Sequence, residues 1–155
     1  MEGKLSLYER LGGIYPISLV VNRFSNSLLT NSIVGERSDN PELSKWHTVD
    51  YATRLPGLKV MRTLWLAAIS GGPFEYTGKS LREAHFHLNI ESDEFDAVAD
   101  ELANALDYYK IQDPERGEVL AAFIAQKPDV TAGSELYEND YINSAIRCPF
   151  GSTYF

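Results

Sequence analysis

Apolar residues recur along much of this chain at spacings of three and four, the pattern that one buried face of a helix produces. The clearest stripe consists of Ile17, Val20, Val21, Phe24 and Leu28. Further stripes predict a helix over about residues 58–69, another that opens near residue 92, and a last one that ends at Pro128. No useful length alternates apolar and polar residues as a half-buried strand would. The pattern therefore predicts one all-α domain of six or seven helices.

Polar residues, glycines and prolines predict where these helices begin and end. Ser6-Leu7-Tyr8-Glu9 and Ser80-Leu81-Arg82-Glu83 both have the form of a capping box, in which serine and glutamate satisfy amides of the first turn. Residues 31–45 lose the helical periodicity and are expected to form a loop. Further helix boundaries are expected at Gly12-Gly13, Pro56-Gly57, Ser92 and Asp113-Pro114.

Composition narrows the classes of partner. The chain has 155 residues, is 44% hydrophobic and carries a formal net charge of -8, which disfavours nucleic acid and anionic membranes as partners. No apolar run approaches the ~20 residues that a membrane span needs, and the residues after Met1 lack the pattern of a signal peptide. Cys148 is the single cysteine, which excludes an intrachain disulfide and favours the cytoplasm.

The segment from Ala132 to Phe155 differs from the rest of the chain. It carries five aromatic residues among polar residues and glycines: Tyr137, Tyr141, Phe150, Tyr154 and Phe155. Such a segment is either disordered or docked on a surface, and its aromatic content favours docking. We therefore expect a domain over residues 1–131 and a C-terminal tail over residues 132–155, with a homodimer through the tail as an open alternative.

The strongest chemical signal lies between residues 71 and 85. Gly71-Gly72 interrupts a helix, and a short segment then presents His85 one turn after Leu81. A lone histidine on an apolar helix face is usually a hydrogen-bonded structural residue, but a neutral imidazole is also the commonest protein ligand of heme iron. His87 would point ~200° away from His85 and is expected in solvent or beside the site. His47 follows Trp46 in the irregular region and could reach a cavity.

Several motifs together resemble the truncated (two-over-two) hemoglobin family. The opening Leu7-Tyr8-Glu9-Arg10-Leu11-Gly12-Gly13, the Gly71-Gly72-Pro73 and Tyr76-x-Gly78 motif, the Arg82-Glu83-Ala84-His85 segment and Phe95-Asp96-Ala97-Val98 are all similar to it. The likeness covers residues 5–30 and 58–130. It implies a shortened globin of four main helices, packed two over two around heme b, with His85 as the proximal iron ligand. Val98 corresponds to a small apolar position that resembles the first group of the family.

The expected distal side departs from the family pattern. The family usually has a tyrosine after the phenylalanine of the second helix, whereas here Ser25 follows Phe24. Its usual glutamine on the third helix is replaced by Arg62. Leu58 and Met61 take the other positions expected to face the ligand, and Met61 as a sixth iron ligand is an open alternative. Trp46, in a longer connection than usual, is the candidate aromatic residue against the heme face.

The resemblance also implies which side chains contact the remaining parts of the heme. Tyr76 and Leu81 are expected to pack on the porphyrin. The propionates need cationic partners. The candidates are Lys79 and Arg82, favoured by their closeness to the histidine-bearing helix, followed by Arg54 and Lys59.

The role of Arg62 separates the functional alternatives. A cation that faces the iron would favour anionic ligands or negative charge on the ligand, and His47 could then move a proton. Alternatively, Arg62 reaches a propionate or solvent and leaves an apolar pocket. The preferred function is a heme protein that binds O2 or NO. The alternatives are a heme enzyme that uses peroxide or O2 on a small organic substrate, and a globin-fold interaction module without heme.

Overall fold

The computed structural model describes residues 3–135, and every regular element in that range is helical. The α-helices are α1 (Leu7–Leu11), α2 (Ile14–Thr30), α3 (Pro41–Lys45), α4 (Tyr51–Ile69), α5 (Leu81–His85), α6 (Ser92–Tyr108) and α7 (Glu115–Ile124). A π-helix, η1 (Trp46–Asp50), joins α3 to α4, and a 3-10 helix, η2 (Phe86–Leu88), follows α5. The predicted all-α fold is confirmed.

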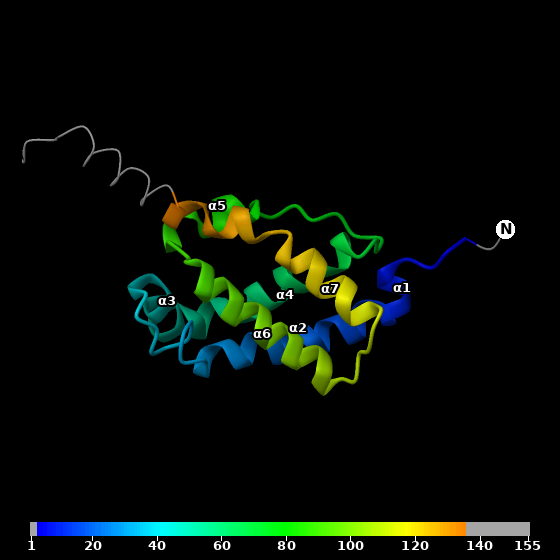
Figure 1. The fold of residues 1–155 in the computed structure, drawn as a ribbon, viewed down its shortest axis with the longest axis horizontal. Coiled ribbons are helices and arrows are strands. Elements are labelled where there is room, and N and C mark those ends of the chain that lie inside the picture. Colours follow the sequence, from blue (N-terminus) through cyan, green and yellow to red (C-terminus); the bar gives the residue numbers. More distant parts are fainter. Residues whose placement is uncertain (1–2, 136–155) are drawn as a thin grey trace, which may run out of the picture.

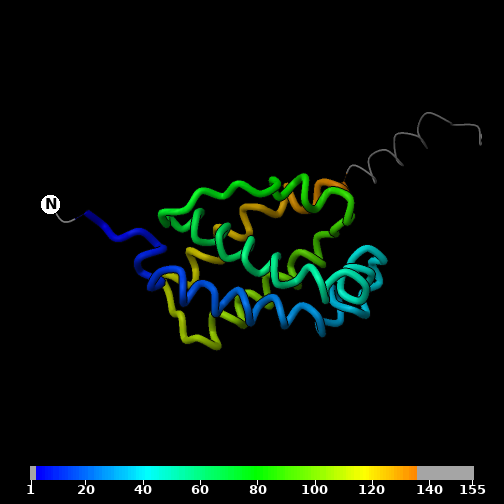
Figure 2. The backbone as a smooth tube through the Cα atoms, turned by 180° about the vertical axis from the view of Figure 1, so that it is seen from behind, coloured from blue at the N-terminus to red at the C-terminus, as the bar shows by residue number. Residues whose placement is uncertain are grey.

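Four longer helices build the body of the molecule (Figure 1). Helix α2 packs against both α4 and α6, and α6 packs against α7, so that two helix pairs are stacked on each other. Helix α3 lies at one end of this body and α1 at the other. The view from behind in Figure 2 shows the connection between α4 and α5 running along one edge of the molecule. None of the helices in the described range is long and apolar enough to cross a membrane.

The core forms where the predicted apolar stripes meet. All five residues of the α2 stripe are buried, and they pack with buried residues of α6 and α7: Phe95, Leu102, Leu106 and Val119. Full burial of one such side chain stabilises the fold by about 1.5–3 kcal/mol. The periodicity of apolar residues was therefore sufficient to predict the centre of the core.

The predicted starts of two helices are confirmed by hydrogen bonds. At α1, the Glu9 amide donates to Ser6 Oγ (3.2 Å) and the Ser6 amide donates to Glu9 Oε2 (2.8 Å), which completes the capping box. Gly12 then ends α1 in the left-handed region (φ 97°), where glycine is favoured. At α5, the Glu83 amide donates to Ser80 Oγ at 3.2 Å. These two caps fix the N-terminus of the fold and the start of the histidine-bearing helix.

Two expectations for the segment before residue 58 were wrong. Pro56 lies inside α4, which begins at Tyr51, instead of forming a turn before it. Proline removes a hydrogen bond to the carbonyl four residues earlier, but Ala52 and Pro56 are both exposed, so water can take that place. The predicted loop over residues 31–45 contains α3, because the Asn40 side chain caps it through the Glu42 amide (3.1 Å).

Smaller corrections concern the last helices. Ser92 is the first residue of α6, and the residue before it, Glu91, is the N-cap. The Glu91 amide donates a hydrogen bond to Glu94 Oε1 at 2.8 Å. Helix α7 begins at Glu115, one residue later than expected, while Asp113 Oδ1 accepts from the Gly117 amide (3.0 Å). The helix ends at Ile124, before the expected end at Pro128. Ile124, expected on the buried side, is exposed.

The chain resumes a helical conformation from residue 127 and remains helical to residue 135. This segment lies beside α5 and η2 in the ribbon of Figure 1 and in the backbone tube of Figure 2. Val130, Thr131 and Ala132 are buried, and Ser134 Oγ donates to the Ile90 carbonyl at 2.8 Å. The expected boundary between residues 131 and 132 falls inside this segment. The five tail aromatics and Cys148 lie outside the described residues.

Candidate cofactor site

His85 is the last residue of α5, and its ring is held by the backbone of its own helix. The Leu81 carbonyl lies 2.7 Å from His85 Nδ1. A carbonyl oxygen can only accept, so Nδ1 carries the proton and Nε2 keeps its lone pair. Burial lowers the pKa of His85 against the opposing effect of that hydrogen bond, and the charge of Arg62 lowers it further. His85 is therefore a neutral imidazole with one nitrogen free to bind a metal.

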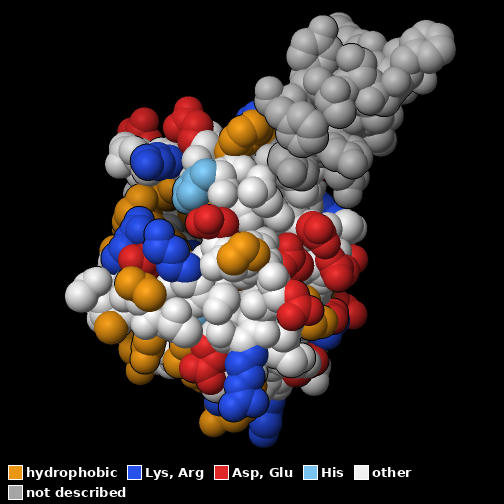
Figure 3. Space-filling model, turned by 90° about the vertical axis from the view of Figure 1, so that its left-hand side faces the viewer, with side chains coloured by type: hydrophobic (Ala, Val, Ile, Leu, Met, Phe, Trp, Pro, Cys, Tyr) orange, Lys and Arg blue, Asp and Glu red, His pale blue; other side chains and the backbone are white. Residues whose placement is uncertain are grey.

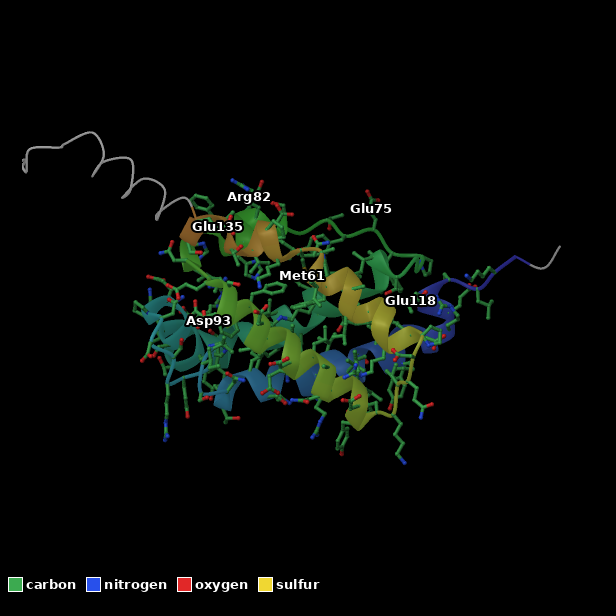
Figure 4. The ribbon with its side chains drawn as sticks, in the orientation of Figure 1. Met61, Glu75, Arg82, Asp93, Glu118 and Glu135 are labelled. Carbon is green, nitrogen blue, oxygen red and sulfur yellow. The ribbon has the colours of Figure 1, made fainter. Side chains whose placement is uncertain are left out.

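The residues around His85 differ in their exposure to solvent, so that one side of this segment faces the core and the other faces solvent. His87 is exposed, in agreement with the expectation that it points away from His85 into solvent. Leu81, one turn before His85, is half-buried against the core. Arg82 is exposed, and its guanidinium lies 6.0 Å from the centre of the Phe86 ring. Figure 4 shows Arg82 on α5 at the edge of the molecule, near Glu135.

Arg62 and Ser25 meet between α4 and α2. Arg62 Nη1 donates to Ser25 Oγ at 2.9 Å, and the guanidinium carbon lies 5.4 Å from the centre of the Phe24 ring. Ser25 and Phe24 are buried, and Arg62 is half-buried. Burial lowers the pKa of Arg62 to about 10, which still leaves the side chain charged at neutral pH. Within residues 3–135, Arg62 forms no salt bridge with a carboxylate.

His47 occupies the π-helix η1 beside Trp46. It is buried, its Nδ1 lies 2.9 Å from the Leu43 carbonyl, and its ring meets the half-buried Trp46 indole edge-on at 5.1 Å. Burial lowers the pKa of His47, the hydrogen bond to Leu43 opposes this, and the charge of Arg62 lowers it further. The same guanidinium thus acts electrostatically on His47 and on His85. Arg62 is therefore a charged group that influences both the buried His47 and the half-buried His85.

The connection between α4 and α5 lies against Met61. A Cβ added to Gly78 would lie 2.4 Å from Met61 Cε, so the absence of a side chain at Gly78 allows this contact. Tyr76 is half-buried, and its hydroxyl donates to the Lys79 carbonyl at 2.9 Å. In Figure 4, Met61 lies near the centre of the molecule, whereas Glu75 lies on the outer edge of this connection.

The candidate cations for heme propionates occupy different surroundings. Lys59 Nζ donates to the side chains of Asn22 (2.8 Å) and Asn26 (2.7 Å), and so it is engaged on α2. Arg54, Lys79 and Arg82 are exposed. Figure 3, which views the end of the molecule that bears α3, shows basic and acidic side chains around a histidine on this face.

Two expected site residues have less distinctive surroundings. Leu58 is half-buried one helical turn before Arg62, and Val98 is half-buried against the core.

Sequence reasoning missed the hydrogen bond between Arg62 and Ser25, because the two residues are 37 positions apart and no periodic pattern links them. It also missed the segment that packs behind α5, whose sequence signal was the pair of small residues Gly133 and Ser134.

The donor chemistry of this region fits a heme. A single imidazole nitrogen with a free lone pair suits an iron whose other ligands come from a macrocycle. Half-buried apolar side chains from three different helices suit the porphyrin faces: Met61, Leu81 and Val98. Exposed cations near α5 suit the propionates.

Comparison with known sequences places the chain among the globins. The model of the Bacterial-like globin family matches residues 6–131. The group 1 truncated hemoglobin GlbN of Mycolicibacterium paratuberculosis is 30% identical over 128 residues, which are 83% of this chain and 85% of that protein. The group 1 truncated hemoglobin of Tetrahymena pyriformis is 29% identical over 106 residues, which are 68% of this chain and 78% of that protein.

Solved structures give the same result for the fold. The truncated hemoglobin from Tetrahymena pyriformis in its Fe(III) form has a TM-score of 0.66 and 25% identity, and the match covers 81% of this chain and 97% of that one. The 2/2 hemoglobin from Synechococcus, solved in the cyanomet state with covalently attached heme, has a TM-score of 0.67 and 24% identity, with 83% and 99% covered. The predicted two-over-two architecture is confirmed.

Proposed function

Because the chain belongs to the truncated hemoglobin family of the bacterial-like globins and its cofactor is heme b, we propose that His85 is the proximal iron ligand of a protein that binds O2 or NO. The observation that carries this proposal is the ring of His85, whose Nδ1 donates to the Leu81 carbonyl and leaves Nε2 free. When bound, the heme would supply an iron centre that can take a diatomic ligand, and His85 would hold that iron.

The hydrogen bond from His85 to the Leu81 carbonyl prepares the imidazole to bind iron. It fixes the tautomer and the orientation of the ring, and it increases the electron density at Nε2. Leu81, one turn earlier on α5, and Tyr76 pack on the porphyrin. Exposed Lys79 and Arg82 bind the propionates, each by a charge-assisted hydrogen bond.

Between α2 and α4, the pair formed by Arg62 and Ser25 takes the place of the tyrosine and glutamine that are usual in the family. Both side chains carry hydrogen-bond donors, and their mutual contact at 2.9 Å holds them together. Trp46, Met61 and Leu58 complete this side of the pocket as apolar neighbours. The expected first-group character agrees with the group 1 relatives.

A second candidate function is heme-dependent chemistry with peroxide or O2 on a small organic substrate. The observation that favours it is the pairing of a buried, neutral imidazole, His47, with the charge of Arg62. The Leu43 carbonyl holds the proton on His47 Nδ1, so Nε2 can accept a proton. We rank this function second because it needs His47 and Arg62 to face the same ligand, whereas ligand binding needs His85 alone.

The proposal is tested by optical spectroscopy of the heme-loaded protein. Wild type, His85→Ala and His87→Ala are compared in the ferric, ferrous and CO-bound states. His87 is the matched control, because it is a histidine two residues away whose side chain is exposed. We expect the His85→Ala protein to lose the spectrum of a histidine-ligated ferrous heme and to regain it with added imidazole, while His87→Ala resembles wild type.

Two results would contradict this assignment. One is a His85→Ala protein with an unchanged ferrous spectrum, and the other is a loss of the spectrum on His87→Ala alone. Addition of hydrogen peroxide to the same samples separates the two candidate functions. An enzyme should show a spectral change that a substrate reverses over many turnovers, whereas a ligand-binding protein should be bleached.

A further inference from the structure

We propose that Arg62 and Ser25 form a binding site for small anions, and that this site strengthens the binding of monoanionic ligands such as fluoride, azide and nitrite to the ferric heme. This inference rests on the proposed function, since the anion would be a ligand of the heme that His85 holds. It goes beyond that function because it specifies the charge of the ligand.

The guanidinium has unused donors. An arginine side chain has five N–H groups, and in the described range one of those of Arg62 donates, to Ser25 Oγ. The remaining guanidinium nitrogens are accessible, because Arg62 is half-buried. In the described range, the fully buried polar side-chain atom that lacks a hydrogen-bond partner is Ser70 Oγ, and no nitrogen of Arg62 is in that position. Arg62 can therefore donate further hydrogen bonds to a small acceptor.

Ser25 adds a second donor to the same place. Its oxygen accepts from the charged guanidinium, so its own hydroxyl hydrogen remains available to an acceptor. Acceptance from a cation also polarises the hydroxyl and strengthens the bond that it donates. A site built from these two groups offers N–H and O–H donors, and an anion, which only accepts, satisfies both.

The charge of Arg62 has no opposite charge nearby in the described part of the chain. The guanidinium forms no salt bridge with a carboxylate of residues 3–135. A partly desolvated cation without a counter-charge is costly, and a bound anion would offset that cost.

The contacts of Arg62 oppose the alternative in which it reaches a propionate at the surface. Its hydrogen bond to Ser25 and its position 5.4 Å from the Phe24 ring direct it toward the buried face of α2. Lys59, one turn earlier on α4, also contacts α2, but it does so at the exposed side chains of Asn22 and Asn26. Arg62 and Lys59 therefore contact different parts of α2.

The test measures ligand affinity in four heme-loaded proteins: wild type, Arg62→Met, Arg62→Gln and Lys59→Met. Sodium fluoride and sodium azide are titrated into the ferric proteins, and CO into the ferrous proteins as a neutral ligand. A hydrogen bond from a charged group contributes ~1.5–3 kcal/mol. Because ~1.4 kcal/mol corresponds to a factor of ten, Arg62→Met should weaken fluoride and azide binding by about 10- to 100-fold.

The controls separate charge from other effects. Arg62→Gln keeps hydrogen-bond donors without the charge and should lose most of the anion affinity. Lys59→Met removes a positive charge from the same helix at a position bound to Asn22 and Asn26, and it should leave both anion affinities within about twofold, because screening weakens distant charges. The affinity for CO should change by less than about threefold in all three variants.

Three results would overturn the inference. Unchanged fluoride and azide affinities in Arg62→Met with normal heme binding would refute it alone and leave the proximal assignment standing. Equal losses for the anions and CO would show that Arg62 acts through packing and not through charge. A wild type without a Soret band after heme addition would overturn both this inference and the proposed function.

Discussion

A methyl group added at Gly133 tests how the helical segment 127–135 holds the histidine-bearing part of the chain. Gly133 is buried, and a Cβ built on it would lie 1.9 Å from the Phe86 carbonyl oxygen and 2.9 Å from its carbonyl carbon. Both are backbone atoms, so no side-chain rotation can relieve the contact. Either the 127–135 segment or the backbone after His85 must therefore move by about 1 Å, since a close-packed interior has no spare space.

The expected cost follows from two opposing effects. Alanine is favoured over glycine inside a helix by up to ~1 kcal/mol. Overpacking a filled interior costs ~1–3 kcal/mol, and the upper half of that range applies because the obstacle is backbone. We therefore expect Gly133→Ala to lower the free energy of unfolding by about 1–2 kcal/mol. The displaced residue, Phe86, directly follows His85, so heme affinity should fall as well.

Urea unfolding of the apo and heme-loaded proteins measures both effects. The matched control is Gly57→Ala, because Gly57 lies inside α4 and a Cβ there meets nothing within 4 Å. That variant should be as stable as wild type or up to ~1 kcal/mol more stable. A Gly133→Ala protein that gains stability as the Gly57→Ala protein does would refute the reasoning, because it would mean that the 127–135 segment is not packed against Phe86.

Two further predictions concern stability. Val119 is fully buried, and Val119→Ala should lower the free energy of unfolding by about 2 kcal/mol through lost burial and a residual cavity, as measured by urea unfolding; a change below ~0.5 kcal/mol would place α7 outside the core. Arg10 Nη1 lies 2.9 Å from Glu115 Oε1, and this hydrogen bond lowers the pKa of Glu115. The ion pair therefore stabilises the protein above the ordinary pKa of glutamate, and the contribution is lost as the pH falls through the lowered folded-state value. Glu115→Gln should lower the melting temperature at pH 7 and approach wild type in acid, and a difference that grows in acid would contradict this sign.

The sequence predicted the parts of the fold that depend on local spacing. Burial of α2 follows from apolar residues repeated along a single helix, and the cap at Ser6 follows from a serine and a glutamate three residues apart. The tautomer of His85 also depends on local spacing, because the carbonyl of Leu81 lies one turn before it. Interactions of this kind need no knowledge of the tertiary structure.

The errors arose where solvent or a distant segment decided the outcome. Pro56 is a helix breaker in sequence, but in α4 it faces solvent, and water can satisfy the carbonyl that it leaves without a donor. The partner of Arg62 could not be predicted, because Ser25 is brought to it by the packing of α2 on α4. The contact of Gly133 with Phe86 likewise depends on where the chain returns after α7.

The two departures from the family pattern at positions 25 and 62 are best understood as one change. Serine is shorter than the usual tyrosine, which leaves space beside α2, and arginine is longer than the usual glutamine, which lets Arg62 reach across that space to Ser25 at 2.9 Å. The pair thus keeps two hydrogen-bond donors between α2 and α4 but adds a positive charge. A tyrosine at position 25 would have to share this space with the guanidinium, so returning one position alone to the family pattern would disturb packing as well as charge. In the function that we propose, the property that distinguishes this pair from a tyrosine–glutamine pair is therefore its positive charge, which would favour a ligand that carries negative charge.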